Sequence, residues 1–275
     1  MGSFSGYLAD LERARPAGGS GRGPENLVVV CSVSSTNRLA RDVAAEYERE
    51  AQHLHPMLIL AHEQSGGRGR QGRSWSSPAG KGVYASRVLT VDGAELLPPL
   101  PLLVGVGLCR ALSRHLPVPC RLKWPNDLVV ETPEGRRKIG GILIEALVRP
   151  GEPGNSAAVA AIIGFGINHG HEAGELPETG TSLRLLGGGA SLAQLTWDLV
   201  AGLESELEHL GDAAYAAAAY RDLSVHRPGD LLAARAGEEV VEGRFAGFDE
   251  RGHLLLDRDG EELRLTAGEV IESWE

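Results

Sequence analysis

The segment EQSGGRGRQGRSW, residues 63–75, places three arginines among four glycines. The guanidinium groups of Arg68, Arg70 and Arg73 are fixed charges that can bind carboxylate and phosphate oxygens through paired hydrogen bonds. Two anions about 4 Å apart repel each other by roughly 4 kcal/mol at an effective dielectric constant of 20, and nearby guanidinium groups offset that repulsion. The glycines would let the segment open for ligand entry and then order over the ligand as a lid. The pattern therefore predicts a site that holds two anions together.

The same glycines, Gly67, Gly69 and Gly72, also fit the dinucleotide-binding pattern G-x-G-x-x-G. In that fold a helix begins directly after the last glycine, and its N-terminus holds the pyrophosphate. Residues 73–82, RSWSSPAGKG, are not expected to begin a helix. We therefore favour ligand binding by the arginine side chains, with a solvated basic loop that binds nothing as the alternative.

The composition excludes several classes of protein. Lys and Arg number 27 against 37 Asp and Glu, so the net charge of −10 argues against general binding to a nucleic-acid backbone. Cys31, Cys109 and Cys120 are widely spaced and predict neither a disulfide framework nor a zinc site. There is no signal-peptide pattern, and the longest apolar runs fall short of the roughly 20 residues that a membrane helix needs. We expect a cytoplasmic protein without membrane contact.

The elements that must position the arginines begin after a Gly- and Pro-rich leader. Residues 1–25 are expected to be flexible or to form a short helix followed by a linker. The next expected elements are a buried strand at 27–33, a helix capped by Ser35, Thr36 or Asn37, a strand at 57–61, a strand at 82–89 and a buried helix at 96–116.

Three closely spaced strand candidates follow, at 120–125, 138–148 and 157–168. Close spacing with glycine turns favours antiparallel pairing, so we expect a mixed sheet packed with helices, an α+β fold. Helices at about 191–210 and 212–223 would close this domain, residues 26–225. Short strands separated by Gly and Asp in residues 226–275 predict a second, small β-barrel domain.

Four motifs occur in order along the chain: SSTN at 34–37, KWPNDL at 123–128, KIGGILIE at 138–145 and GFGIN at 164–168. With GFDERGHLLL and AGEV near the C-terminus, the chain from about residue 27 to 275 resembles the biotin–protein ligase family in its short form. That resemblance implies a catalytic domain related to class II tRNA synthetases and lipoate ligases, followed by an SH3-like barrel.

The resemblance also implies a two-step reaction. Biotin and Mg-ATP give biotinyl-5′-AMP and pyrophosphate, and the biotinyl group then passes to a lysine of a biotin carboxyl carrier domain. A cationic lid would let the two anions meet and would keep water from the mixed anhydride. Only about 26 residues precede the first expected strand, too few for the winged helix of DNA-binding members, so no DNA partner is expected. A monomer and a homodimer are both compatible with the sequence.

The motifs assign residues to the two substrates. The resemblance implies contacts with biotin for Ser35, Thr36, Asn37, Gln64, Gly67, Arg68, Arg70, Lys138 and Gly140. It implies contacts with ATP for Arg70, Arg73, Trp75, Asn126, Lys138 and Asn168. Hydroxyl and amide groups suit a neutral ring that carries both donors and acceptors.

Lys138, Arg70 and Asp127 are the expected catalytic residues. If 123–127 and 138–145 pair as a hairpin, the Lys138 ammonium can bridge the biotin carboxylate and the α-phosphate. Asp127 would either bind Mg²⁺, together with Asn168, or orient and deprotonate the acceptor lysine. His169 and His171 are expected to face solvent rather than to bind a metal.

Two other functions compete with this interpretation. A lipoate or octanoate ligase would share the fold and the adenylate chemistry, but an SGGG segment would be expected in place of the arginine-rich one. An RNA-binding module would need further basic residues with aromatic residues between them, whereas the aromatic content is 5%.

Overall fold

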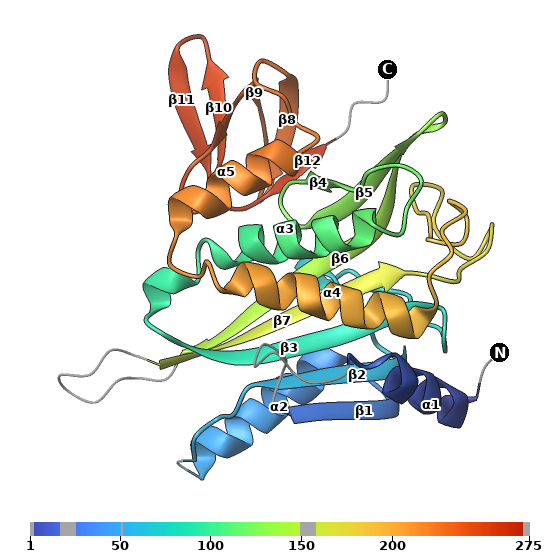
Figure 1. Cartoon of the computed structure of the whole chain (residues 1–275). Helices are drawn as coiled ribbons and strands as arrows, with labels where there is room; N and C mark the ends of the chain where they lie inside the picture. The colour runs from blue at the N-terminus through green and yellow to red at the C-terminus, as the bar shows by residue number, and fades with distance from the viewer. Residues whose placement is uncertain (1–2, 17–25, 51, 149–157, 272–275) are drawn as a thin grey trace.

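A seven-stranded sheet forms the centre of the molecule, in the order β1-β2-β3-β7-β6-β5-β4. The computed structural model describes residues 3–16, 26–50, 52–148 and 158–271 (Figure 1). The strands are β1 (Asn26–Val33), β2 (Met57–Gln64), β3 (Gly82–Asp92), β4 (Arg121–Lys123), β5 (Asp127–Thr132), β6 (Gly135–Val148) and β7 (Ala158–Asn168). Only β1 and β2 run parallel, and the other neighbouring pairs are antiparallel. The expected mixed sheet is confirmed.

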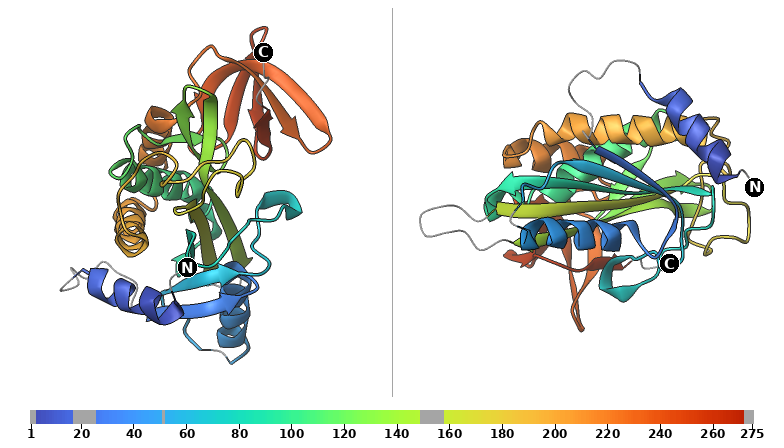
Figure 2. Two further views of the ribbon diagram at one scale, coloured as in Figure 1. Left: turned by 90° about the vertical axis from the view of Figure 1, so that its right-hand side faces the viewer. Right: turned by 90° about the horizontal axis from the view of Figure 1, so that it is seen from below.

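Helices cover the two faces of this sheet unequally (Figure 2). On one face lie α3 (Leu100–Ser113), α4 (Leu192–Leu207) and α5 (Ala213–Leu223), which bury the larger apolar core. On the other face α2 (Thr36–Arg49) packs on β2, β3, β6 and β7 and buries a smaller core around Ala40, Ile59 and Ile162. Because α2 alone covers this second face, part of the sheet beyond its N-terminus is left for a cavity.

A second sheet follows at the C-terminus. Its strands are β8 (Leu231–Ala236), β9 (Glu239–Phe248), β10 (Leu254–Arg258), β11 (Glu261–Leu265) and β12 (Glu269–Ile271), in the order β11-β10-β9-β8-β12 with antiparallel pairing. This sheet is compatible with the expected SH3-like barrel. It contacts the first sheet through Trp124, whose indole N–H donates to the carbonyl of Gly252 at 2.9 Å.

The N-terminal residues include a short helix, α1 (Phe4–Ala14), which was one of the two expectations for the leader. The helix lies across α4 (Figure 2), where the indole N–H of Trp197 donates to the carbonyl of Leu11 at 2.9 Å. Residues 17–25, where a linker was expected, lie outside the described residues.

Two expectations about strands were wrong. The apolar run at 27–33 was expected to be buried, but β1 is the edge of the sheet, and Val28 and Cys31 are exposed. Strand β5 was missed, because the KWPND motif was expected to lead straight to the strand at 138. The chain instead turns after β4, enters β5 at Asp127 and returns as β6 in a tight hairpin.

None of the described helices is long and apolar enough to cross a membrane.

A tyrosine hydroxyl in the core is buried without a partner among the described residues. Tyr220 on α5 is 1% exposed, its ring packs edge-on against Phe248 at 5.0 Å, and its hydroxyl has no hydrogen-bond partner among the described residues. Tyr84 is buried to the same extent, but its hydroxyl donates to the carbonyl of Pro78 at 3.0 Å.

We predict that Tyr220→Phe raises the free energy of unfolding by about 1 kcal/mol, because it removes an unsatisfied buried hydroxyl and keeps the ring. The matched Tyr84→Phe variant loses a made hydrogen bond and should be destabilised by about 1 kcal/mol. Urea unfolding of both variants and of the parent chain measures the two values. Equal destabilisation of both variants would contradict the prediction.

Candidate active site

A cavity of about 670 Å³ opens on the face of the central sheet that α2 leaves uncovered. Its walls come from the N-terminus of α2, the lid (residues 66–75), the KWPND turn, β6, β7 and the C-terminal sheet. The predicted site residues that line it are Ser35, Thr36, Asn37, Gln64, Arg68, Arg70, Arg73, Trp75, Asn126, Asp127, Lys138 and Asn168. Residues that are far apart in sequence thus meet in one cavity.

The floor of the cavity depends on two glycines that pair across neighbouring strands, Gly141 on β6 and Gly166 on β7. The indole of Trp75 lies against this pair. A Cβ atom on Gly166 would stand 2.5 Å from Nε1 of Trp75, and one on Gly141 would stand 3.5 Å from its Cζ3. The Nε1 atom is buried and has no partner among the described residues. Trp75 therefore forms part of the wall, with its indole packed against the strands.

Each arginine of the lid contacts an acceptor on another element. Arg68 donates to Oε2 of Glu145 on β6 at 2.7 Å, and Arg70 donates to the carbonyl of Gly268 at 3.2 Å. Arg73 forms a two-pronged ion pair with Glu269 on β12, in which one N–O distance is 2.8 Å. The lid thus rests on both the central sheet and the C-terminal sheet.

The pKa values of two of these arginines shift in opposite directions. Burial lowers the pKa of Arg70, although the nearby charges of Asp127 and Glu269 oppose the shift. The hydrogen bond to Glu269 raises the pKa of Arg73, and the same bond lowers the pKa of the Glu269 carboxyl. Arg70 is therefore the less hydrated cation of the two, and an anion beside it would be the more strongly attracted.

Lys138 and Asp127 form an ion pair across the β5–β6 hairpin, with Nζ 2.5 Å from Oδ1. The backbone of Lys138 is held by residues 179–181, because its N–H donates to Thr179 and its carbonyl accepts from Thr181. Its ammonium also lies 5.6 Å from the centre of the Trp75 ring. The hairpin differs from the expected pairing of 123–127 with 138–145, because residues 121–123 pair with β5 and only Asp127 of the motif pairs with β6, opposite Gly141. It nevertheless brings two of the three predicted catalytic residues into contact.

The far end of the cavity is a chain of neutral polar groups at the start of α2. Oγ1 of Thr36 lies 2.8 Å from Oγ of Ser86, and Ser86 donates to Oδ1 of Asn37 at 2.6 Å. Gln64 accepts from the Thr36 backbone N–H at 2.8 Å and donates to Ser77 at 2.8 Å. Such a set of donors and acceptors suits a neutral polar ring.

The side chains expected to bind Mg²⁺ present one carboxylate and one amide oxygen. The Nδ2 of Asn168 donates to the carbonyl of Thr181 at 3.0 Å, which leaves Oδ1 for a ligand, and Asp127 lines the same cavity. Mg²⁺ in nucleotide sites takes one or two carboxylates together with water and substrate phosphates. The donor set therefore fits a metal ion that arrives with the nucleotide.

Two glycines were predicted to contact biotin, and the structure places both away from the cavity surface. The next residue, Gly141, occupies the position expected for Gly140, whose Cα faces Ile167 and Leu128 in the core. A one-residue irregularity in the β5–β6 pairing lies beside it, as in a β-bulge. A Cβ on Gly67 would lie 2.4 Å from the carbonyl of Trp75, so this glycine closes the base of the lid.

The expectation that His169 and His171 face solvent was wrong. His171 is fully buried, neither ring nitrogen has a partner among the described residues, and burial lowers its pKa. Burial also lowers the pKa of His169, and its ring nitrogen lies 2.8 Å from the carbonyl of Ala190. Both rings help to pack the loop after β7, whose backbone bonds to Lys81 and reaches Lys138.

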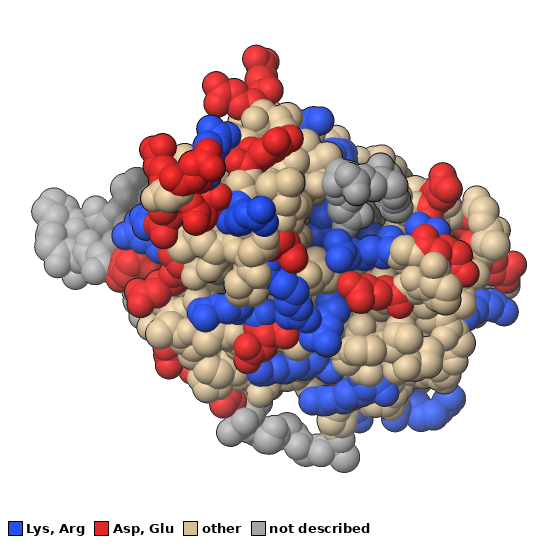
Figure 3. Space-filling model, turned by 90° about the horizontal axis from the view of Figure 1, so that it is seen from above, with Lys and Arg blue, Asp and Glu red and all other residues tan. Residues whose placement is uncertain are grey.

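Sequence reasoning missed four polar residues that hold the site together: Arg41, Ser86, Glu145 and Glu269. Glu145 and Glu269 stand inside the motifs KIGGILIE and AGEV, but neither was given a role. The available signal for a role was their negative charge, which is opposite to that of the arginine-rich segment. Figure 3 shows the cations of this acidic protein gathered in a band across one face, between areas richer in Asp and Glu.

Comparison with known protein families identifies the family to which this chain belongs. Residues 29–168, which include the start of α2, the lid, the KWPND turn and the two central strands, match the model of the Biotin/lipoate A/B protein ligase family. The chain belongs to this family. The family resemblance expected from the motifs is confirmed.

Several relatives are similar over most of this chain. The bifunctional ligase/repressor BirA of Escherichia coli is 32% identical over 86% of this chain and 70% of its own length. The biotin–[acetyl-CoA-carboxylase] ligases of Mycobacterium tuberculosis and Paracoccus denitrificans are 28% and 30% identical, over 92% and 78% of this chain and 91% and 89% of their own lengths.

Solved structures agree on the fold. A biotin protein ligase from Aquifex aeolicus, in complex with biotin and ATP, superposes with a TM-score of 0.67 at 24% identity, covering 90% of this chain and 98% of that chain. A biotin acetyl coenzyme A carboxylase synthetase from Helicobacter pylori, with bound biotinylated ATP, has a TM-score of 0.55 at 21% identity, covering 87% of this chain and 99% of that chain. The expected fold is therefore confirmed.

The anchoring of the lid by Glu269 is testable. Exposed ion pairs contribute about 0.2–1 kcal/mol, so Glu269→Ala should speed tryptic cleavage after the lid arginines by about 1.5- to 5-fold. Glu262→Ala is the control, because Glu262 is an exposed carboxylate of the same sheet that pairs with Arg264. Mass spectrometry of the early fragments gives both rates. Equal rates in the two variants would show that the ion pair does not hold the lid.

Proposed function

We propose that this protein is an ATP-dependent biotin–protein ligase, which forms biotinyl-5′-AMP and then transfers the biotinyl group to a lysine of a carrier domain. The support comes from the family membership, from relatives named biotin–[acetyl-CoA-carboxylase] ligase, and from the cavity. The observation that carries the proposal is that one cavity joins a neutral polar end, at Thr36 and Gln64, to a cationic end, at Arg70 and Lys138. Biotin has a ureido ring at one end and a carboxylate at the other.

In the first step a carboxylate oxygen of biotin attacks the α-phosphorus of ATP, and pyrophosphate leaves. The ring would bind at the start of α2, and Arg68 and Arg70 would receive the carboxylate. Lys138 would stabilise the charge that builds up on the oxygen between the carboxyl carbon and phosphorus. Trp75 and Arg73 would cover the nucleotide, and the lid would exclude water from the anhydride. Mg²⁺ held by the phosphates, Asp127 and Asn168 would neutralise part of the phosphate charge.

In the second step the amine of the acceptor lysine attacks the acyl carbon, and AMP leaves. The attacking ammonium group must lose a proton, and Asp127 is a carboxylate beside the reacting groups that can orient it and accept that proton. The ion pair with Lys138 keeps Asp127 within reach of both steps. The partner would be a biotin carboxyl carrier domain in the cytoplasm, and no DNA partner is proposed. Monomeric and dimeric forms would both accommodate this chemistry.

Incubation with Mg-ATP and radiolabelled biotin, lipoate or octanoate tests the proposal, with a carrier domain added in a second set of tubes. We expect adenylate from biotin, and label on the carrier lysine. Label from lipoate or octanoate alone would instead assign the chain to that branch of the family. Adenylate formation without transfer to the carrier would contradict the proposed acceptor.

Lys138 is the catalytic residue with the clearest expected effect. Lys138→Ala should lower kcat of adenylate formation by about 100- to 1000-fold, as found when one donor to a developing oxyanion is removed. Arg137→Ala is the matched control, because this neighbouring cation is not among the described residues that line the cavity. Pyrophosphate release measures both rates. A Lys138→Ala variant with full activity would exclude the proposed role.

A further inference from the structure

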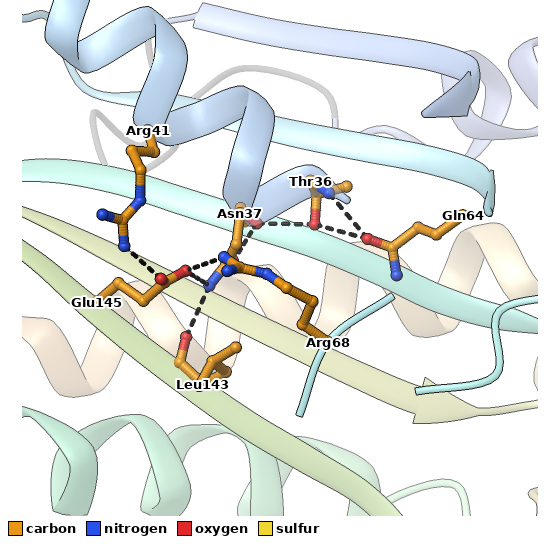
Figure 4. A network of polar contacts seen from close by, with 8 residues as sticks. Thr36, Asn37, Arg41, Gln64, Arg68, Leu143 and Glu145 are labelled. Atoms are coloured by element: carbon orange, nitrogen blue, oxygen red, sulfur yellow. Dashed lines mark hydrogen bonds and ion pairs between the residues drawn. The ribbon is translucent and has the colours of Figure 1, made fainter. Parts of the chain in front are cut away.

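The carboxylate of Glu145 lies behind the polar end of the cavity and binds three side chains from two elements (Figure 4). Its side chain is 15% exposed. Asn37 donates to Oε2 at 2.9 Å, Arg68 of the lid donates to the same oxygen at 2.7 Å, and Arg41 of α2 pairs with Oε1. Nothing in the proposed reaction steps uses this carboxylate.

An ionised carboxylate can only accept hydrogen bonds, and this restricts the neighbouring amide. Asn37 must turn its Nδ2 toward Glu145, where Nδ2 also donates to the carbonyl of Leu143 at 3.1 Å. Its Oδ1 then faces the hydroxyl of Ser86 at 2.6 Å, so Ser86 must donate its only proton to Asn37. The oxygen of Ser86 is left to accept from Thr36 at 2.8 Å.

The other end of this series of hydrogen bonds is fixed by a group that can only donate. The backbone N–H of Thr36 can only donate, and it bonds to Oε1 of Gln64 at 2.8 Å. Gln64 must therefore turn its Nε2 toward Ser77, at 2.8 Å. Because Ser86 gives its proton to Asn37, the Thr36 hydroxyl must donate to Ser86. This leaves Oγ1 of Thr36 as an acceptor and Nε2 of Gln64 as a donor at the cavity wall.

We propose that Glu145 is a positioning residue that fixes the direction of the hydrogen bonds at the ring-binding end of the cavity and so selects a ring with both N–H and C=O groups. The inference rests on the proposed function, because it concerns how that site recognises its acid substrate. It assigns Glu145 no contact with the ligand.

The charge state of Glu145 is consistent with this role. Burial alone would raise the pKa of its carboxyl, but the hydrogen bonds from Asn37 and Arg41 and the charge of Arg68 outweigh burial and hold the pKa below its ordinary value. The carboxylate is therefore ionised at neutral pH, the form that only accepts. Arg41 also provides charge compensation for Glu145 when the carboxylate of a ligand draws Arg68 away.

The test compares Glu145→Gln, Glu145→Asp and the control Glu131→Gln, which changes an exposed carboxylate on β5. A glutamine has the same size but can donate or accept, so Asn37 is no longer forced into one orientation. We expect Glu145→Gln to raise the biotin Kd and KM about tenfold, the effect of one misdirected hydrogen bond, while KM for ATP and kcat stay within about twofold. Glu145→Asp keeps an acceptor and should recover part of the affinity.

The same experiment includes lipoate, whose ring lacks the N–H and C=O groups of biotin. The preference for biotin over lipoate should fall in Glu145→Gln by a factor similar to the loss in biotin affinity. Unchanged biotin affinity and preference in Glu145→Gln would overturn the inference, and so would equal losses for biotin and ATP without recovery in Glu145→Asp. A parent chain that binds no biotin would contradict the proposed function itself, which the control measurements show separately.

Discussion

The proposed reaction brings two anions together, the carboxylate of biotin and the α-phosphate of ATP. The arginines that offset their repulsion lie on the lid, a segment that cannot fold by itself. The lid has too many glycines to bury a core, so its position is set by where its arginines find acceptors. Glu145, the carbonyl of Gly268 and Glu269 supply those acceptors from two different sheets. Ligand anions would therefore exchange with existing protein contacts instead of recruiting free cations, which reduces the reorganisation that binding requires.

The sheet makes this arrangement possible by leaving one face partly uncovered. Helices α3, α4 and α5 pack on one face, whereas α2 covers only one end of the other. The N-terminus of α2 then faces the cavity with Thr36 and Asn37, and the glycines of β6 and β7 leave room for Trp75. The part of the sheet that each segment reaches thus places neutral polar groups at one end of the cavity and cations at the other.

Much of this could be predicted from the sequence, because the motifs combine residue types that have few other uses. The arginines among glycines, the KWPND turn and the assignment of Lys138 and Asp127 to one site all depend on local patterns. The failures concern long-range geometry. Tertiary packing sets three features that local patterns do not. These are the position of β1 at the edge of the sheet, the choice between Gly140 and Gly141 as the glycine that faces the cavity, and the carboxylate that each arginine contacts. His171 looked like a surface residue because polarity, not packing, was the only local signal.

The contacts between the lid and β12 join residues nearly 200 positions apart in the chain. The lid can therefore take its observed position only once the C-terminal sheet has packed beside the central sheet. Without β12, the central sheet would keep its own part of the cavity wall, but Arg70 and Arg73 would lose their acceptors.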